Sequence, residues 1–165
     1  MTSASQAVAW ELKGKLAVKT QTDKANTNLY WLHTPEADEL RLTSVLGTTL
    51  LLLKSTNTSA MLMVDGKEYH GNNAHQLLYS LTGWSLPLSQ MPLWVTGQTS
   101  AQDQVISRDA HRRPVQLHTL GSPQWQIKYT SWQTLSGAEI PRLLTMKNDK
   151  TRLKIQVNQW QALSN

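Results

Sequence analysis

The feature that most constrains the fold is an alternation of apolar and polar residues close to the start of the chain. Between residues 10 and 20, Leu12, Leu16 and Val18 are apolar at even positions, whereas most odd positions hold lysine or glutamate. A period of two is typical of a β-strand with one buried and one solvated face. Further strand-like runs, separated by turn residues, cover residues 27–33, 39–42, 48–53, 60–64, 67–70, 105–109, 115–119, 124–132, 140–146 and 151–160.

One segment in the middle of the chain has helical spacing instead. The apolar residues that recur at this spacing are Ala74, Leu77, Leu78 and Leu81. Asn72 or Asn73 can cap the start of this helix, and Gly83 can close its end. A second, short helix is predicted from Ser89 as N-cap to near Gly97, with Pro92 in its first turn.

These patterns predict a mainly β protein of ten or eleven strands with one helical insertion. An antiparallel sheet of that size must curl or close, and the insertion would cover its concave face. The 165 residues suit one domain spanning 1–165, with a flexible or helical lead-in at residues 1–9.

The charge and the N-terminus limit the classes of partner. A net charge of +5 suits an acidic partner or an anionic surface, but the basic residues are scattered along the sequence, so no nucleic-acid partner is expected. No stretch is long and apolar enough to span a bilayer, and we expect the chain to be soluble. Met1 resembles an expression start placed on a trimmed protein, from which a signal peptide would have been removed.

The sequence contains no recognisable catalytic constellation. Cysteine is absent, and the five histidines lie far apart without metal-ligand spacing. Neither a phosphate-binding glycine loop nor a nucleophile elbow is present. These absences predict that the protein is not an enzyme and holds no metal.

A leucine stands in an unusual position between two predicted strands. Leu46 lies in the turn after residues 39–42 and beside Gly47, whose permissive backbone suits a tight connection. Either Leu46 folds back onto its own sheet or it contacts something apolar outside the protein.

The aromatic composition favours an apolar cavity. The chain has seven Trp and four Tyr but no Phe. Tryptophan combines a large apolar area with a polar N–H, which suits the wall of a cavity where an apolar ligand meets water, although plain core packing is the alternative for any single Trp. Leucine and methionine are also abundant and would accept an acyl chain without demanding one shape.

Several segments resemble the LolB family of outer-membrane lipoprotein receptors of Gram-negative bacteria. They are Leu-Thr-Ser-Val-Leu-Gly-Thr-Thr-Leu at 42–50, Leu-Thr-Gly-Trp-Ser-Leu-Pro-Leu at 81–88, Leu-Trp-Val-Thr-Gly at 93–97, and the close of the chain from Ile140-Pro141 to Trp160. The resemblance covers roughly residues 10–160.

The resemblance implies a curled antiparallel sheet that forms an incomplete (half) barrel covered by short helices. It further implies a protein that accepts acylated lipoproteins from the periplasmic carrier LolA and releases them into the inner leaflet of the outer membrane. Neither covalent chemistry nor a cofactor would be involved. The natural protein would be anchored by lipid on the periplasmic face, through an N-terminal cysteine that this chain lacks. A soluble carrier of the LolA kind and a periplasmic enzyme acting on a hydrophobic substrate are the alternatives.

The resemblance also assigns a role to the turn. Val45, Leu46 and Gly47 match the family's protruding membrane-targeting loop, with Val45 where we expect a proline. The acyl-chain cavity is assigned by alternation and helical spacing to Leu16, Val18, Leu29, Trp31, Leu40, Leu42, Leu50 and Leu52 in the sheet and to Leu77, Leu81, Leu86 and Trp94 in the cover.

Overall fold

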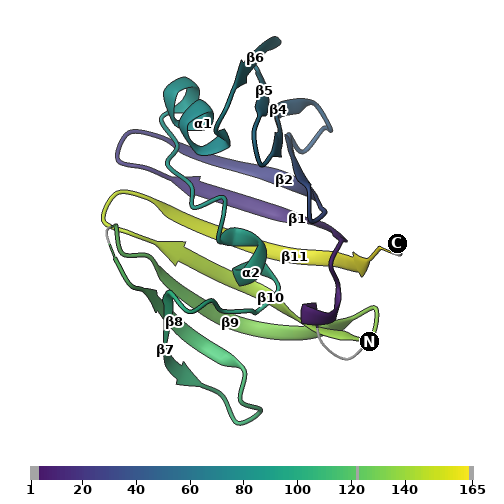
Figure 1. The fold of residues 1–165 in the computed structure, drawn as a ribbon, viewed down its shortest axis with the longest axis vertical. Helices are drawn as coiled ribbons and strands as arrows, with labels where there is room; N and C mark the ends of the chain where they lie inside the picture. The colour runs from purple at the N-terminus through teal and green to yellow at the C-terminus, as the bar shows by residue number, and fades with distance from the viewer. Residues whose placement is uncertain (1–3, 122, 164–165) are drawn as a thin grey trace.

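The computed structural model describes residues 4–121 and 123–163, which form one antiparallel sheet of eleven strands with two α-helices on one side (Figure 1). The strands are β1 (Trp10–Lys19), β2 (Lys24–His33), β3 (Ala37–Thr43), β4 (Thr49–Thr56), β5 (Ala60–Val64), β6 (Lys67–Gly71), β7 (Asp103–Arg108), β8 (Pro114–Thr119), β9 (Gln126–Leu135), β10 (Ala138–Lys147) and β11 (Arg152–Ala162). Their order across the sheet is β6-β5-β4-β3-β2-β1-β11-β10-β9-β8-β7. The N-terminal and C-terminal strands are therefore neighbours at the centre of the sheet.

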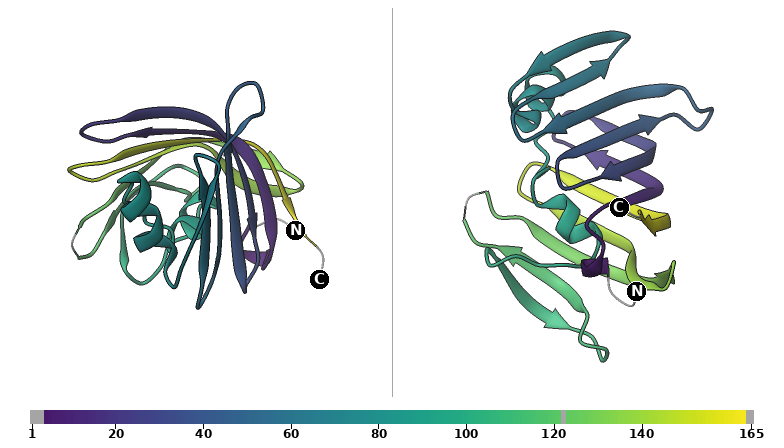
Figure 2. Two further views of the ribbon diagram at one scale, coloured as in Figure 1. Left: turned by 90° about the horizontal axis from the view of Figure 1, so that it is seen from above. Right: turned by 45° about the vertical axis from the view of Figure 1, so that its right-hand side comes forward.

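The sheet curls strongly but does not close into a barrel, and β6 and β7 are its two edge strands. Figure 2 shows both helices within this curl, on the concave side of the sheet. The buried apolar side chains form one cluster that joins the sheet to the helices, with Trp31 and Trp94 among its largest members. The prediction of a mainly β half barrel covered by short helices is confirmed.

The helix α1 (Ala74–Thr82) begins and ends as its sequence predicts. The Asn73 side chain accepts a hydrogen bond from the backbone N–H of Gln76, and Gly83 closes the helix in the left-handed conformation at φ 77°. This N-cap satisfies a backbone N–H that would otherwise lack a partner. The helix packs on β4, β5 and β6.

The second helix, α2 (Met91–Val95), is shorter than predicted. Its N-cap is Gln90 rather than Ser89, and no side-chain hydrogen bond caps it. The Ser89 hydroxyl donates to the side-chain oxygen of Gln90 instead (3.1 Å), so it is not available to the helix. Pro92 lies in the first turn, where its missing N–H has no cost.

The lead-in predicted at residues 1–9 lies only partly within the described residues. Ala4–Gln6 forms a short 3-10 helix, and Ala4 is buried against the core.

Candidate functional site

An apolar cavity lies between the concave face of the sheet and the helical cover. Its volume is about 20 Å³, which is close to the minimum that holds one water molecule. Its walls are made entirely by Leu, Ile, Met and Trp side chains, namely Leu16, Leu29, Leu40, Leu42, Leu51, Leu53, Leu78, Trp84, Leu86, Leu88, Met91 and Ile155. The cavity therefore has the chemistry of a site for an apolar ligand, but it is almost closed.

The structure brings part of the predicted lining together. The residues that line the cavity as placed from the sequence are Leu16, Leu29, Leu40, Leu42 and Leu86. Val18, Trp31 and Trp94 are buried in the surrounding core, and Leu77 packs against it half-buried. The role of these residues in binding acyl chains stays a prediction.

The prediction is wrong for β4, whose residues face the opposite way. Leu50 is 44% exposed, and Leu52, although buried, lies outside the core cluster. Leu51 and Leu53 face the cavity instead, opposite Leu42 and Leu40 of β3. The cause is a register shift at the start of β4: Leu42 pairs with Leu51 but Thr43 pairs with Thr49, so Leu50 is an extra, unpaired residue.

The prediction is also wrong for Leu81. Its side chain is 37% exposed and is absent from the core cluster. Leu78, one turn earlier on the same helix, is the α1 residue that is buried and lines the cavity.

Sequence reasoning missed the remaining lining residues for different reasons. Trp84, Leu88 and Met91 lie in an irregular connection and a very short helix, where no period indicates which side chains point inward. Ile155 was recognisable, because it alternates with Lys154 and Gln156 in the last strand.

Polar contacts fix α2 to the sheet beside the cavity. The buried Tyr129 hydroxyl donates to the backbone carbonyl of Trp94 (2.6 Å), and the Trp94 indole N–H donates to Asp103 (3.1 Å). Burial, with a smaller effect of Asp103, raises the pKa of the Tyr129 hydroxyl, which keeps it protonated as a donor. The α2 side of the cover is thus firmly attached.

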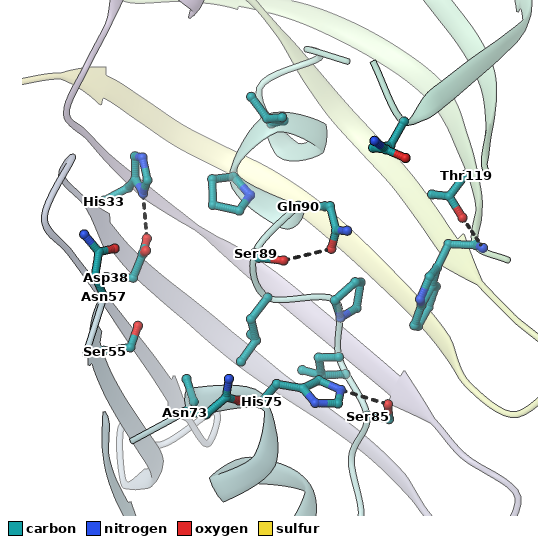
Figure 3. A pocket seen from close by; sticks show the side chains of 18 of the residues that line it. His33, Asp38, Ser55, Asn57, Asn73, His75, Ser85, Ser89, Gln90 and Thr119 are labelled. Atoms are coloured by element: carbon teal, nitrogen blue, oxygen red, sulfur yellow. Dashed lines mark hydrogen bonds and ion pairs between the residues drawn. The ribbon is translucent and has the colours of Figure 1, made fainter. Parts of the chain in front are cut away.

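A larger cleft of about 980 Å³ adjoins the apolar cavity (Figure 3), and we call it the polar cleft because many polar side chains line it beside apolar ones. Two residues, Leu86 and Leu88, line both spaces. Figure 3 shows the polar pairs of its wall, among them His33 with Asp38 (2.6 Å) and His75 with Ser85 (3.1 Å). The segment after α1 therefore separates an apolar from a polar compartment.

The predicted loop between β3 and β4 is a hairpin tip held by backbone hydrogen bonds. Val45 is 92% exposed and Leu46 is 94% exposed. Below them the Ser44 backbone N–H donates to the Thr48 carbonyl (2.8 Å), and the Gly47 N–H donates to the Ser44 carbonyl (2.9 Å). Gly47 has φ 88°, which a glycine adopts without strain. Hydrogen bonds therefore shape this loop, which has no proline. Of the two hypotheses for Leu46, the side chain does not fold back onto the sheet but is exposed.

The comparisons with known proteins agree with this architecture. Residues 8–160 match the family described as "Outer membrane lipoprotein LolB". The chain belongs to the LolB family. It is 54% identical over 161 residues to an outer-membrane lipoprotein LolB of Shewanella woodyi, covering 97% of this chain and 76% of that protein. It is 53% identical over 163 residues to the LolB of Shewanella loihica, covering 98% and 76%.

Solved structures show the same fold at low sequence identity. A LolA superfamily protein from Nitrosomonas europaea has a TM-score of 0.57 at 8% identity, over 95% of this chain and 87% of that one. A putative outer membrane lipoprotein-sorting protein domain from Vibrio parahaemolyticus has a TM-score of 0.56 at 9% identity, over 95% and 86%. The half barrel of this LolB family member is therefore shared with LolA-like proteins.

Within residues 4–121 and 123–163, no group of three or more His, Cys, Asp or Glu side chains is placed to hold a metal ion. None of the helices in this part of the chain has the length and apolar character that crossing a bilayer requires.

Proposed function

We propose that this LolB family member binds the acyl chains of lipoproteins and incorporates the lipoproteins into the outer membrane without covalent chemistry. The observation that carries this proposal is the wholly apolar cavity between the sheet and its helical cover. Each acyl CH₂ kept from water stabilises the bound state by about 0.8 kcal/mol, so a multiply acylated lipoprotein needs a shielded route between membranes.

Acceptance of the cargo requires the cavity to expand. At about 20 Å³ it has no room for an acyl chain. Most of the side chains around it are leucines, with one methionine, and unbranched or γ-branched side chains of this kind can repack around chains of different shape. Expansion of the cavity breaks contacts between its lining side chains, and contacts with the bound acyl chain replace them.

The polar cleft suits the polar part of the same cargo. Because Leu86 and Leu88 line both spaces, acyl chains in the cavity would place the attached ester and amide groups at the cleft. Uncharged groups such as Ser85, Ser89 and Asn73 can donate and accept hydrogen bonds there.

Membership of the LolB family supports an inference about the partners. We infer that the periplasmic carrier LolA delivers the cargo, and that the natural protein works at the periplasmic face of the outer membrane, held there by a lipid anchor. The exposed tip formed by Val45, Leu46 and Gly47 would contact the inner leaflet during release. Its backbone hydrogen bonds support insertion as a formed loop.

Native mass spectrometry with a lipoprotein tests the acyl-chain proposal. The purified protein is mixed with a triacylated lipoprotein from its carrier, and in parallel with the same lipoprotein lacking the acylated cysteine. We expect a stoichiometric complex only with the acylated form, and a competing fatty acid should reduce it. An equally abundant complex with the unacylated form would show that the cavity does not carry the recognition.

A further inference from the structure

Four cationic side chains form a row across neighbouring strands of the sheet. In the strand register, Lys24 of β2 lies opposite Lys19 of β1, Lys19 opposite Arg152 of β11, and Arg152 opposite Lys147 of β10. All four are exposed. With about 4.8 Å between strands, this basic row spans roughly 14 Å.

The basic row lies on the convex face. The chain neighbours Val18, Leu153 and Met146 are buried in the core cluster on the concave side. Successive side chains of a strand point to opposite faces, so the cations point away from the helices. On the same face Lys154 and Lys128 lie one step further along their strands, each opposite Thr145.

Folding alone gives no reason for this arrangement. Like charges directly opposite each other on adjacent strands destabilise a sheet. Among the described residues, no carboxylate lies within 4 Å of any of the four cationic groups. The neighbouring Asp23 accepts a hydrogen bond from the Lys24 backbone N–H in the turn instead. The positive charges of the basic row are therefore not neutralised within the described residues and can attract an external anion.

The basic row and the exposed loop lie at the same end of the sheet. Lys19 and Lys24 flank the turn between β1 and β2. Strand β3 runs antiparallel to β2 toward this end of the sheet, and its last pair is Thr43 with Asn28, four residues from Lys24, just before the loop at residues 44–48. The left view of Figure 2 shows this loop projecting on the side away from the two helices, which is the convex side. A flat surface that touches the tip of the loop therefore faces the basic row.

We propose that the basic row is a second membrane contact, which binds the phosphate groups of anionic phospholipids while Leu46 enters the apolar boundary. This rests on the proposed membrane contact of the loop. Each basic side chain near an anionic bilayer strengthens partitioning about fivefold. The two contacts together would orient the convex face toward the bilayer and leave the helical cover on the concave side accessible to the carrier.

The test compares two variants with the same change in net charge. Lys19→Gln with Arg152→Gln removes the centre of the basic row, and Arg108→Gln with Arg112→Gln removes two exposed cations at the other end of the sheet. Partitioning is measured by sedimentation with vesicles of phosphatidylglycerol and phosphatidylcholine, and with vesicles of phosphatidylcholine alone.

On the anionic vesicles, we expect the row variant to bind at least tenfold more weakly than the parent and the control variant to bind within about twofold. On phosphatidylcholine alone the three proteins should bind equally. The melting temperature of the row variant should be unchanged or higher, because repulsion is removed.

Three results would overturn the proposal. The first is that the row variant binds anionic vesicles as strongly as the parent, and the second is that the control variant loses as much binding as the row variant. The third is that the row variant loses only its acceptance of cargo from the carrier, which would assign the row to contact with an acidic protein. Leu46→Glu, measured in parallel, should lose binding to both kinds of vesicle. If Leu46→Glu kept its binding, the proposed membrane contact of the loop would be wrong, whereas the lipid contact of the basic row would still be judged by the row variant.

Discussion

At the scale of the residue, Leu46 is the most informative side chain. A leucine that is 94% exposed at the end of a hydrogen-bonded hairpin tip contributes little to the core. The sequence departs from the expected family pattern at Val45, but the contacts of Ser44 with Gly47 and Thr48 shape the loop. An exposed apolar side chain held in this way is suited to a contact outside the protein.

Leu46→Glu is expected to separate folding and acceptance from release. Because the side chain lies in solvent, the melting temperature should stay within about 2 °C of the parent, since surface substitutions change stability little. Transfer from carrier to receptor should persist, whereas transfer from receptor to liposomes should fall at least tenfold, because a charge is costly in the apolar boundary of a bilayer. Strong destabilisation would mean that Leu46 belongs to the core, and loss of acceptance alone would place the loop at the carrier interface.

At the scale of the element, β4 shows how one extra residue decides what a strand presents. The run of four leucines at 50–53 has no alternation of its own, so either pair can face inward. The unpaired Leu50 shifts the alternation of side chains between the two faces of β4. The pairing of Leu42 with Leu51 and of Leu40 with Leu53 then decides that Leu51 and Leu53 face the cavity.

Glutamate substitutions at two adjacent positions test the face of β4. Leu51→Glu places a charge in the apolar cavity and should lower the free energy of unfolding by several kcal/mol, or prevent folding. Leu50→Glu should change it by less than about 1 kcal/mol, because this side chain already meets solvent. Urea titrations of both variants give the comparison, and the reverse order of stability would show that the strand is inverted.

At the scale of the whole molecule, the two helices differ in how they are attached. Tyr129 and Asp103 tie α2 to the rest of the fold through Trp94. Among the described residues, no hydrogen bond joins α1 to a strand, and apolar packing of Leu77 and Leu78 holds this helix in place. The cavity is therefore expected to open on the α1 side.

A disulfide between β6 and α1 should lock the cavity closed. A Cβ at Gly71 would lie 3.7 Å from the Leu77 Cβ, within the usual range of disulfides, and the chain has no other cysteine. Oxidised Gly71→Cys with Leu77→Cys should bind a fluorescent fatty acid at least tenfold more weakly than the same protein reduced. The two single variants are the controls. Equal binding in both redox states would show that the opening does not require α1 to leave β6.

The sequence by itself determined the kinds of element and most of their positions. Period-two alternation in β1 and β11, the Asn73 cap and the Gly83 stop are local signals, and local signals are readable without knowing the neighbours. The exposed turn at Leu46 was also visible, although its exposure followed only from the family resemblance.

The tertiary structure alone decided three features. The register shift at Leu50 inverted the predicted face of β4, because a bulge depends on the partner strand. The packing of Leu78, Trp84 and Met91 closed the cavity to a small space. Lysines and an arginine that are scattered in the sequence became one row, because antiparallel pairing places the two ends of the chain side by side.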